Sequence, residues 1–172
     1  MLKNKFFFVD AETDGLYGNI ISVAVIITDG DCKTLSTHYM GVRKENLVVT
    51  NQWVRENVVP KLGDYTPYES EYDLLEAVWT LWHESGATWA VADCCCPVES
   101  HLFRKCVEHN PEERMFQGPF PLVDIASMKV AKGLDPIATL QEYAHRNGGE
   151  QHNALYDVET TIMEYRALLP KP

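Results

Sequence analysis

The hydrophobic residues near the start of this chain fall into short continuous runs. Two runs, at 5–10 (KFFFVD) and 20–28 (IISVAVIIT), are rich in aromatic and β-branched side chains. Such runs are typical of buried β-strands. A turn at Asp29–Asp31 (DGD) precedes a more polar strand expected at 33–42. These segments predict a three-stranded antiparallel meander.

After the meander, the apolar residues follow helical spacing. The clearest helix, at 70–85, has Ser70 at its start and Gly86 after its end, and both are residue types that cap helices. Short strands are expected at 88–92 and 121–124. Further helices are predicted at 51–59, 97–109, 125–131, 136–146 and 154–168.

This order of elements predicts an α/β fold. Its mixed five-stranded sheet would combine an antiparallel meander with parallel strands that follow it, flanked by helices. No repeat or linker-like stretch interrupts the 172 residues, so we expect a single domain over 1–172. Functional side chains in such sheets gather at the carboxyl ends of strands, and Asp10 and Asp93 both follow predicted strands.

Composition narrows the class of protein. Hydrophobic residues make up 45% of the chain, which argues against disorder, and no apolar run approaches the roughly 20 residues of a membrane span. The N-terminus lacks a small-residue cleavage site. A cytoplasmic protein that does not bind membranes is therefore expected. The five cysteines, three of them adjacent at Cys94–Cys96, are expected to be reduced thiols at a strand end, with thiolate metal binding as the alternative.

The formal net charge of −10 is unusual for a protein that binds nucleic acid through electrostatics alone, because such surfaces are usually basic. Bound divalent cations would offset the charge locally. The global charge therefore says little about the chemistry of an acidic site.

Two acidic segments carry the candidate chemistry. In FVDAETDGLYG, Asp10 and Glu12 follow a buried strand and point to the same side of it. Adjacent carboxylates repel each other unless a cation lies between them. In QHNALYDVETTIMEY, Asp157 lies in the first turn of a helix, and His152 precedes that helix on a loop. If Asp157 faces the pair, three carboxylates surround one point, which suits Mg²⁺.

The patterns DxETxGL and HxALxD in these segments resemble the first and third motifs of the DEDDh 3′–5′ exonucleases. That family has the ribonuclease H-like superfold, and the predicted order of elements extends the resemblance over nearly the whole chain. The resemblance implies a metal-dependent hydrolase. Its products would be nucleoside 5′-monophosphates released from the 3′ ends of single-stranded nucleic acid.

The resemblance also implies roles for these residues. Asp10, Glu12 and Asp157 would hold two divalent ions, Mg²⁺ or Mn²⁺, which activate water and stabilise the leaving oxygen in such enzymes. His152 would be the general base that takes the proton of the water.

A short segment after the first motif matches the family's site for the 3′-terminal nucleotide. The matching residues are Thr13, Gly15 and Leu16, with His152 from the third motif. A glycine there would let the backbone approach the ligand. Asp14 departs from the family pattern, which usually has threonine or a similar residue.

The second motif has two candidate acids, both for metal binding and for catalysis. The family has an Asp in the first turn of a helix, with bulky apolar residues three and four positions later. In VADCCCPVESHLF, Asp93 has the expected residue type but precedes the predicted helix. Glu99 has the expected placement, with Leu102 and Phe103 after it. The simpler alternatives are a helix cap for Asp93 and a favourable helix N-terminal charge for Glu99.

The identity of the nucleic acid rests on a further resemblance. The segment 53–62 (WVRENVVPKL) is similar to part of the bacterial exoribonucleases of this superfamily that prefer adenylate-rich RNA. RNA is therefore favoured, with DNA trimming or proofreading as the alternative. A catalytically silent nucleic-acid-binding module on the same fold is the alternative from another class. The amphipathic helices would permit a homodimer.

Two further expectations concern side chains near these motifs. The four tryptophans are expected in the core, although an exposed one could stack on a base; they are Trp53, Trp79, Trp82 and Trp89. Asp124 is expected to cap a helix.

Overall fold

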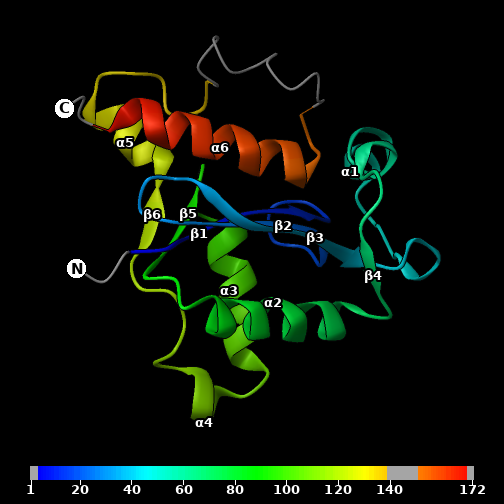
Figure 1. The fold of residues 1–172 in the computed structure, drawn as a ribbon. Helices are drawn as coiled ribbons and strands as arrows, with labels where there is room; N and C mark the ends of the chain where they lie inside the picture. The colour runs from blue at the N-terminus through cyan, green and yellow to red at the C-terminus, as the bar shows by residue number, and fades with distance from the viewer. Residues whose placement is uncertain (1–3, 139–150, 170–172) are drawn as a thin grey trace.

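The computed structural model describes residues 4–138 and 151–169. A mixed sheet forms its centre, and helices cover both faces (Figure 1). The strands lie in the order β4 (Thr66–Tyr68), β3 (Thr34–Val42), β2 (Ile20–Thr28), β1 (Phe6–Thr13), β5 (Trp89–Ala92) and β6 (Leu122–Asp124). β1, β2 and β3 pair antiparallel, and β5 runs parallel to β1 and β6. The α/β fold with a meander and parallel strands is confirmed.

Six α-helices surround this sheet in the described part of the chain. They are α1 (Gln52–Asn57), α2 (Glu71–Ser85), α3 (Val98–Glu108), α4 (Pro111–Arg114), α5 (Ile125–Ala131) and α6 (Ala154–Leu168). Two short 3₁₀ helices, η1 (Lys44–Asn46) and η2 (Val59–Lys61), flank α1.

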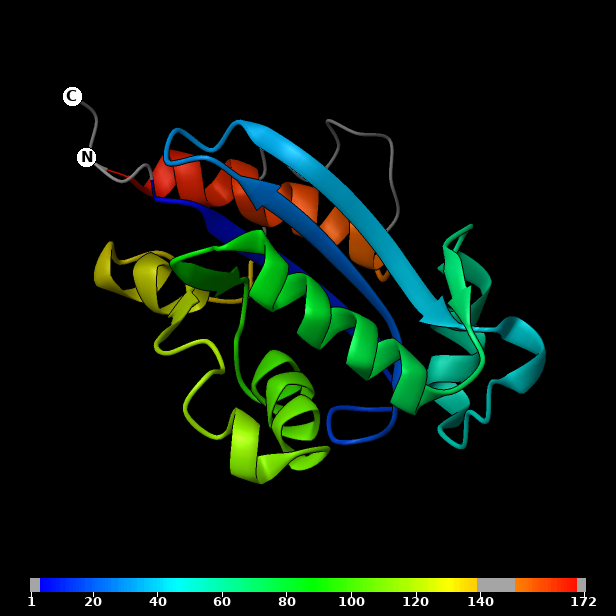
Figure 2. The same cartoon turned by 60° about the horizontal axis from the view of Figure 1, so that its bottom comes forward.

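The alternation of side chains along β1 divides the core into two layers. Phe7 and Val9 pack with residues of α2 and α3, and Figure 2 shows both helices on that side of the sheet. Phe6 and Phe8 point to the opposite face and pack with residues of α5 and α6. Because alternate residues share a face, Asp10 lies on the α6 side.

The capping predictions are confirmed. The Ser70 side chain accepts a hydrogen bond from the Asp73 N–H at the start of α2, and Gly86 ends that helix with a left-handed backbone. Asp124 caps α5 by accepting a hydrogen bond from the Ser127 N–H. Pro97 is the residue before α3 rather than its first helical residue.

The sheet contains one strand more than expected. β4 has only three residues, including Pro67, and pairs with β3 at the sheet edge. Proline is tolerated at such edges because one side of an edge strand needs no hydrogen bond donors. Its short length and its proline hide it from strand periodicity. The helix predicted at 136–146 lies largely outside the described residues.

The tryptophans divide between core and surface. Trp79 and Trp82 are buried, as expected, and Trp89 is half-buried against Phe6. The core prediction is wrong for Trp53, whose side chain is 52% exposed. Its helix packs through Val54 instead, so the indole remains at the surface.

The cysteines and the helices can be compared with the expectations from composition. All five cysteines are free thiols, with Cys95 buried and its neighbours Cys94 and Cys96 exposed. No helix in residues 4–138 or 151–169 combines the length and apolar character that a membrane crossing requires.

Candidate active site

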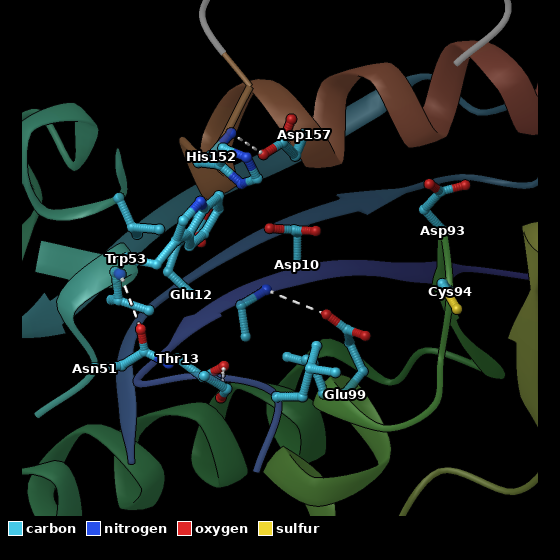
Figure 3. A pocket seen from close by; sticks show the side chains of 16 residues that line it. Asp10, Glu12, Thr13, Asn51, Trp53, Asp93, Cys94, Glu99, His152 and Asp157 are labelled. Carbon is cyan, nitrogen blue, oxygen red and sulfur yellow. Dashed lines mark hydrogen bonds between the residues drawn. The ribbon is translucent and has the colours of Figure 1, made fainter. Parts of the chain in front are cut away.

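Three acids from opposite ends of the chain meet at one point. Asp10 and Glu12 share the face of β1 that α6 covers, and Asp157 lies in the first turn of α6. One carboxylate oxygen from each lies within 4.8 Å of the others. Figure 3 shows Asp157 above Asp10 and Glu12 at the mouth of a cleft. The structure thus brings together the three acids that the motifs indicate.

The electrostatics of this cluster fit a divalent cation. Burial, reinforced by Asp157, raises the pKa of Glu12 to about 7. Burial also raises the pKa of Asp157 to about 6. The pKa of Asp10 is raised well above its ordinary value, first by burial and then by the charge of Glu99. The ionised carboxylates repel one another, and a divalent ion between them would relieve this repulsion. Carboxylate oxygens are also the donors that hard divalent cations prefer.

Glu99 approaches this cluster from α3, and its charge contributes to the raised pKa of Asp10. Its side chain is only 5% exposed, and Oε1 accepts a hydrogen bond from the Ala11 N–H at 3.3 Å. Burial raises its pKa to about 8. Because Ala11 lies between Asp10 and Glu12, the contact joins Glu99 to the segment of β1 that carries both acids, and Figure 3 shows Glu99 reaching this strand from α3.

Asp93 has a different environment. It follows β5, and its carboxylate forms an ion pair with the Nζ of Lys129 at 3.0 Å. The same ammonium group pairs with Glu164 at 2.7 Å, and the Lys129 side chain is fully buried. Asp93 therefore has an internal cation as its partner, although it still lines the cleft.

His152 lies beside the acid cluster, just before α6. Its backbone N–H donates to Asp157 Oδ2 at 3.0 Å. Its ring meets the ring of Trp53 at a centroid distance of 5.1 Å and nearly at right angles. Burial and then the positive charge of Lys61 lower the pKa of His152. A lowered pKa favours the neutral imidazole, which is the form that can accept a proton.

A cavity of about 510 Å³ opens in front of the acids. Its wall includes Thr13, Gly15 and Leu16, the residues that match the family's nucleotide segment. Gly15 has a φ of +80°, and a Cβ at this position would lie 3.1 Å from the Asn51 amide nitrogen. The left-handed backbone therefore favours glycine, and the nearby Asn51 side chain leaves little room for a Cβ.

The adjacent wall is formed by α1 and the residues that flank it. Asn51, Trp53, Val54 and Val58 line the cavity from this side. The similarity of the segment 53–62 to exoribonucleases was the available signal. Helical spacing alone could not show that the indole of Trp53 faces the cleft.

Asp14 connects the two walls. Its carboxylate accepts hydrogen bonds from the Thr50 N–H at 2.8 Å, the Thr50 hydroxyl at 2.7 Å and the Asn51 N–H at 2.9 Å. The departure from the family pattern at this position thus serves to anchor the start of α1.

Solved structures share this architecture. An exonuclease I from Methylocaldum szegediense matches with a TM-score of 0.64 and 17% identity over 95% of this chain and 40% of its own. E. coli exonuclease I in complex with a dA16 oligonucleotide matches with a TM-score of 0.60 and 18% identity, also over 95% and 40%. Exonuclease X in complex with 5′ overhanging duplex DNA has a TM-score of 0.51 and 22% identity, over 95% of this chain and 90% of its own.

The chain thus spans about two fifths of the exonuclease I chains that it matches. No protein-family model matches the sequence, and no curated protein matches it either. The similarity therefore lies in the three-dimensional arrangement. This chain has the ribonuclease H-like fold of the DEDDh-type 3′–5′ exonucleases.

Proposed function

We propose that this protein is a metal-dependent 3′–5′ exonuclease that releases nucleoside 5′-monophosphates from single-stranded nucleic acid. The convergence of Asp10, Glu12 and Asp157 in front of a cleft, with a neutral His152 beside them, carries the proposal. Structural neighbours with this fold are exonucleases, some of them solved with single-stranded DNA. One of these complexes contains a zinc ion.

The acids would hold two Mg²⁺ or Mn²⁺ ions. Asp10, Glu12 and Asp157 form the closest group, and Glu99 would be the fourth ligand, since it is buried and hydrogen-bonds to the residue between Asp10 and Glu12. Asp93 would support the site through its ion pair with Lys129. When bound, such ions supply Lewis-acid activation of water and charge stabilisation of the leaving 3′-oxygen.

His152 would act as the general base. A neutral imidazole at the cleft, beside an acid cluster that binds the metals, can take the proton of a water molecule that attacks the terminal phosphodiester. Thr13, Gly15 and Leu16, which line the same cleft, would receive the terminal nucleotide. An open side of the cleft suits a flexible single strand, which can present its end to the acids.

The sugar of the substrate remains a prediction. The segment 53–62 favours RNA, whereas two of the three solved neighbours named above, E. coli exonuclease I and exonuclease X, are complexes with DNA. Discrimination depends on contacts to the 2′-hydroxyl. RNA and DNA oligonucleotides of the same sequence should therefore be compared directly. The single domain over 1–172, the homodimer and the cytoplasmic location also remain predictions.

The central experiment incubates the purified chain with 5′-labelled single-stranded oligonucleotides and Mn²⁺ or Mg²⁺. We expect stepwise shortening from the 3′ end that stops when a chelator is added. Asp157→Asn should abolish shortening, whereas Glu84→Gln, at an exposed glutamate of α2, should not. A gel shift without shortening would instead support the silent binding module.

A further inference from the structure

The backbone of His152 adopts a conformation that needs support. Its φ is +73°, and it is one of two non-glycine residues with a positive φ in residues 4–138 and 151–169. Side chains with a Cβ rarely adopt this left-handed region, because the Cβ crowds the following carbonyl. Surrounding contacts must therefore hold the residue in place.

The end of η2 holds the residues on both sides of His152. The Nζ of Lys61 donates to the Gln151 carbonyl at 3.3 Å. The carbonyl of Lys61 accepts a hydrogen bond from the Asn153 side-chain amide at 2.7 Å. The backbone of His152 is thus fixed by one neighbouring segment and by its own bond to Asp157.

Trp53 contacts the imidazole itself. The two ring planes are 89° apart, an edge-to-face arrangement that aromatic rings favour. Figure 3 shows the indole directly below the imidazole and beside Glu12. A large indole that remains 52% exposed contributes little to the core. Its position is explained better by what it contacts at the cleft.

The helix that carries Trp53 is firmly anchored. Asn51 caps α1 by accepting a hydrogen bond from the Val54 N–H, and Asp14 binds the N–H of Asn51. Val54 in α1 and Val58 at the end of the helix are also buried in a small core with Ile21. These contacts hold α1 in place, so the indole of Trp53 is fixed between His152 and the segment of Thr13, Gly15 and Leu16.

From these contacts we infer that Trp53 is a positioning residue that acts through His152. It restricts the imidazole to the side of the cleft where Asp157 and Glu12 lie, before any substrate arrives. The effect on turnover rests on the proposed function, whereas the effect on the imidazole does not. The alternative is that Trp53 acts directly on the substrate by stacking on a base.

Steady-state kinetics on a single-stranded oligonucleotide separate the two roles. We expect Trp53→Ala to lower kcat by about 10- to 100-fold with KM little changed, since small misplacements of a catalytic group have effects of this size. Trp53→Phe should restore most of the loss because it keeps an aromatic ring. Phe116→Ala, at a residue 93% exposed in the segment after α4, is the control and should leave kcat unchanged.

A double variant tests whether Trp53 acts through the histidine. His152→Asn removes the imidazole while tolerating the left-handed backbone. Trp53→Ala should cause no further loss in that background. If the activity losses of the two single variants multiply in the double variant, or if Trp53→Ala raises KM without changing kcat, the positioning role is wrong and base stacking is favoured.

An NMR measurement is independent of turnover. The ring Cε1–H resonance of His152, assigned with His152→Asn, should shift and broaden in Trp53→Ala, because the ring current and the restraint are lost. An unchanged resonance overturns the inference. A shifted resonance in a protein that releases no nucleotides would overturn the proposed function and leave the positioning contact standing.

Discussion

The carboxylate of Glu99 accepts a hydrogen bond from the backbone N–H of Ala11 at 3.3 Å. This bond joins the first turn of α3 to the residue between Asp10 and Glu12. The side chain of a glutamate is one methylene longer than that of an aspartate, and the extra reach allows an acid on α3 to contact β1. The hydrogen bond therefore favours Glu99 over Asp93 as the acid of the proposed second motif.

The roles of the two second-motif candidates can be separated by amide substitutions. Glu99→Gln keeps an oxygen for the Ala11 N–H but removes a charge from the acid cluster. We expect nuclease turnover to fall by more than the roughly 10- to 100-fold that accompanies loss of an outer-sphere partner. For Asp93→Asn, the loss of turnover should lie within that range, since Asp93 pairs with Lys129. Initial rates at saturating Mn²⁺ measure both, and a larger loss for Asp93→Asn would reverse the assignment.

Removing a carboxylate from the cluster should stabilise the metal-free protein. Glu12 is buried, and its pKa is raised to about 7 in the folded protein. At pH 8 it is mainly ionised, and burying this charge destabilises the folded state relative to the unfolded state. Glu12→Gln should therefore raise the free energy of unfolding by about 1–3 kcal/mol at that pH. Thermal melts with chelator test this, at about 2–4 °C per kcal/mol. The exposed control Glu84→Gln should not change the melt, and a lower Tm for Glu12→Gln would contradict the clustering.

The stability of the metal-free protein should fall as pH rises from 5 to 8. The pKa values of Asp157, Glu12 and Glu99 rise to about 6, 7 and 8 in the folded protein, above their ordinary values near 4. In this range the folded state therefore binds more protons than the unfolded state, and its stability declines with pH. The lowered pKa of His152 opposes part of the decline.

Urea denaturation at several pH values measures this slope. A divalent ion should reverse it, because metal binding displaces protons from the acids and strengthens as pH rises. A flat profile without metal would show that the acids are not coupled as the structure indicates.

The buried ammonium group of Lys129 should be important for folding. It lies between Asp93 and Glu164, and Lys129→Met would leave both carboxylates without that cation. Breaking a buried ion pair in this way typically costs about 3–5 kcal/mol. The double variant Lys129→Met/Glu164→Leu should recover most of this loss. Lys105→Met breaks a partly exposed pair with Glu71 and should cost about 1 kcal/mol or less. Equal losses for the two lysines would contradict this account.

Local sequence patterns predicted most of the secondary structure elements and revealed the two acidic motifs, although they missed β4. Apolar runs predicted β1 and β2 because buried strands need continuous hydrophobic side chains. Helical spacing predicted α6, and helical spacing together with caps predicted α2. Period-two alternation also placed Asp10 and Glu12 on one face. These are local properties, set by residues a few positions apart.

Tertiary structure decided which acids meet and which residues support them. Asp93 and Glu99 are only six positions apart in the sequence. The packing of α5 gives Asp93 the ammonium group of Lys129 as its partner, whereas the packing of α3 brings Glu99 to the N–H of Ala11. The exposure of Trp53 likewise depends on which side of α1 packs against Ile21. The partners of these acids and the exposure of Trp53 depend on contacts between segments that are distant in the sequence. The hydrophobic pattern of one segment does not show which other segment packs against it.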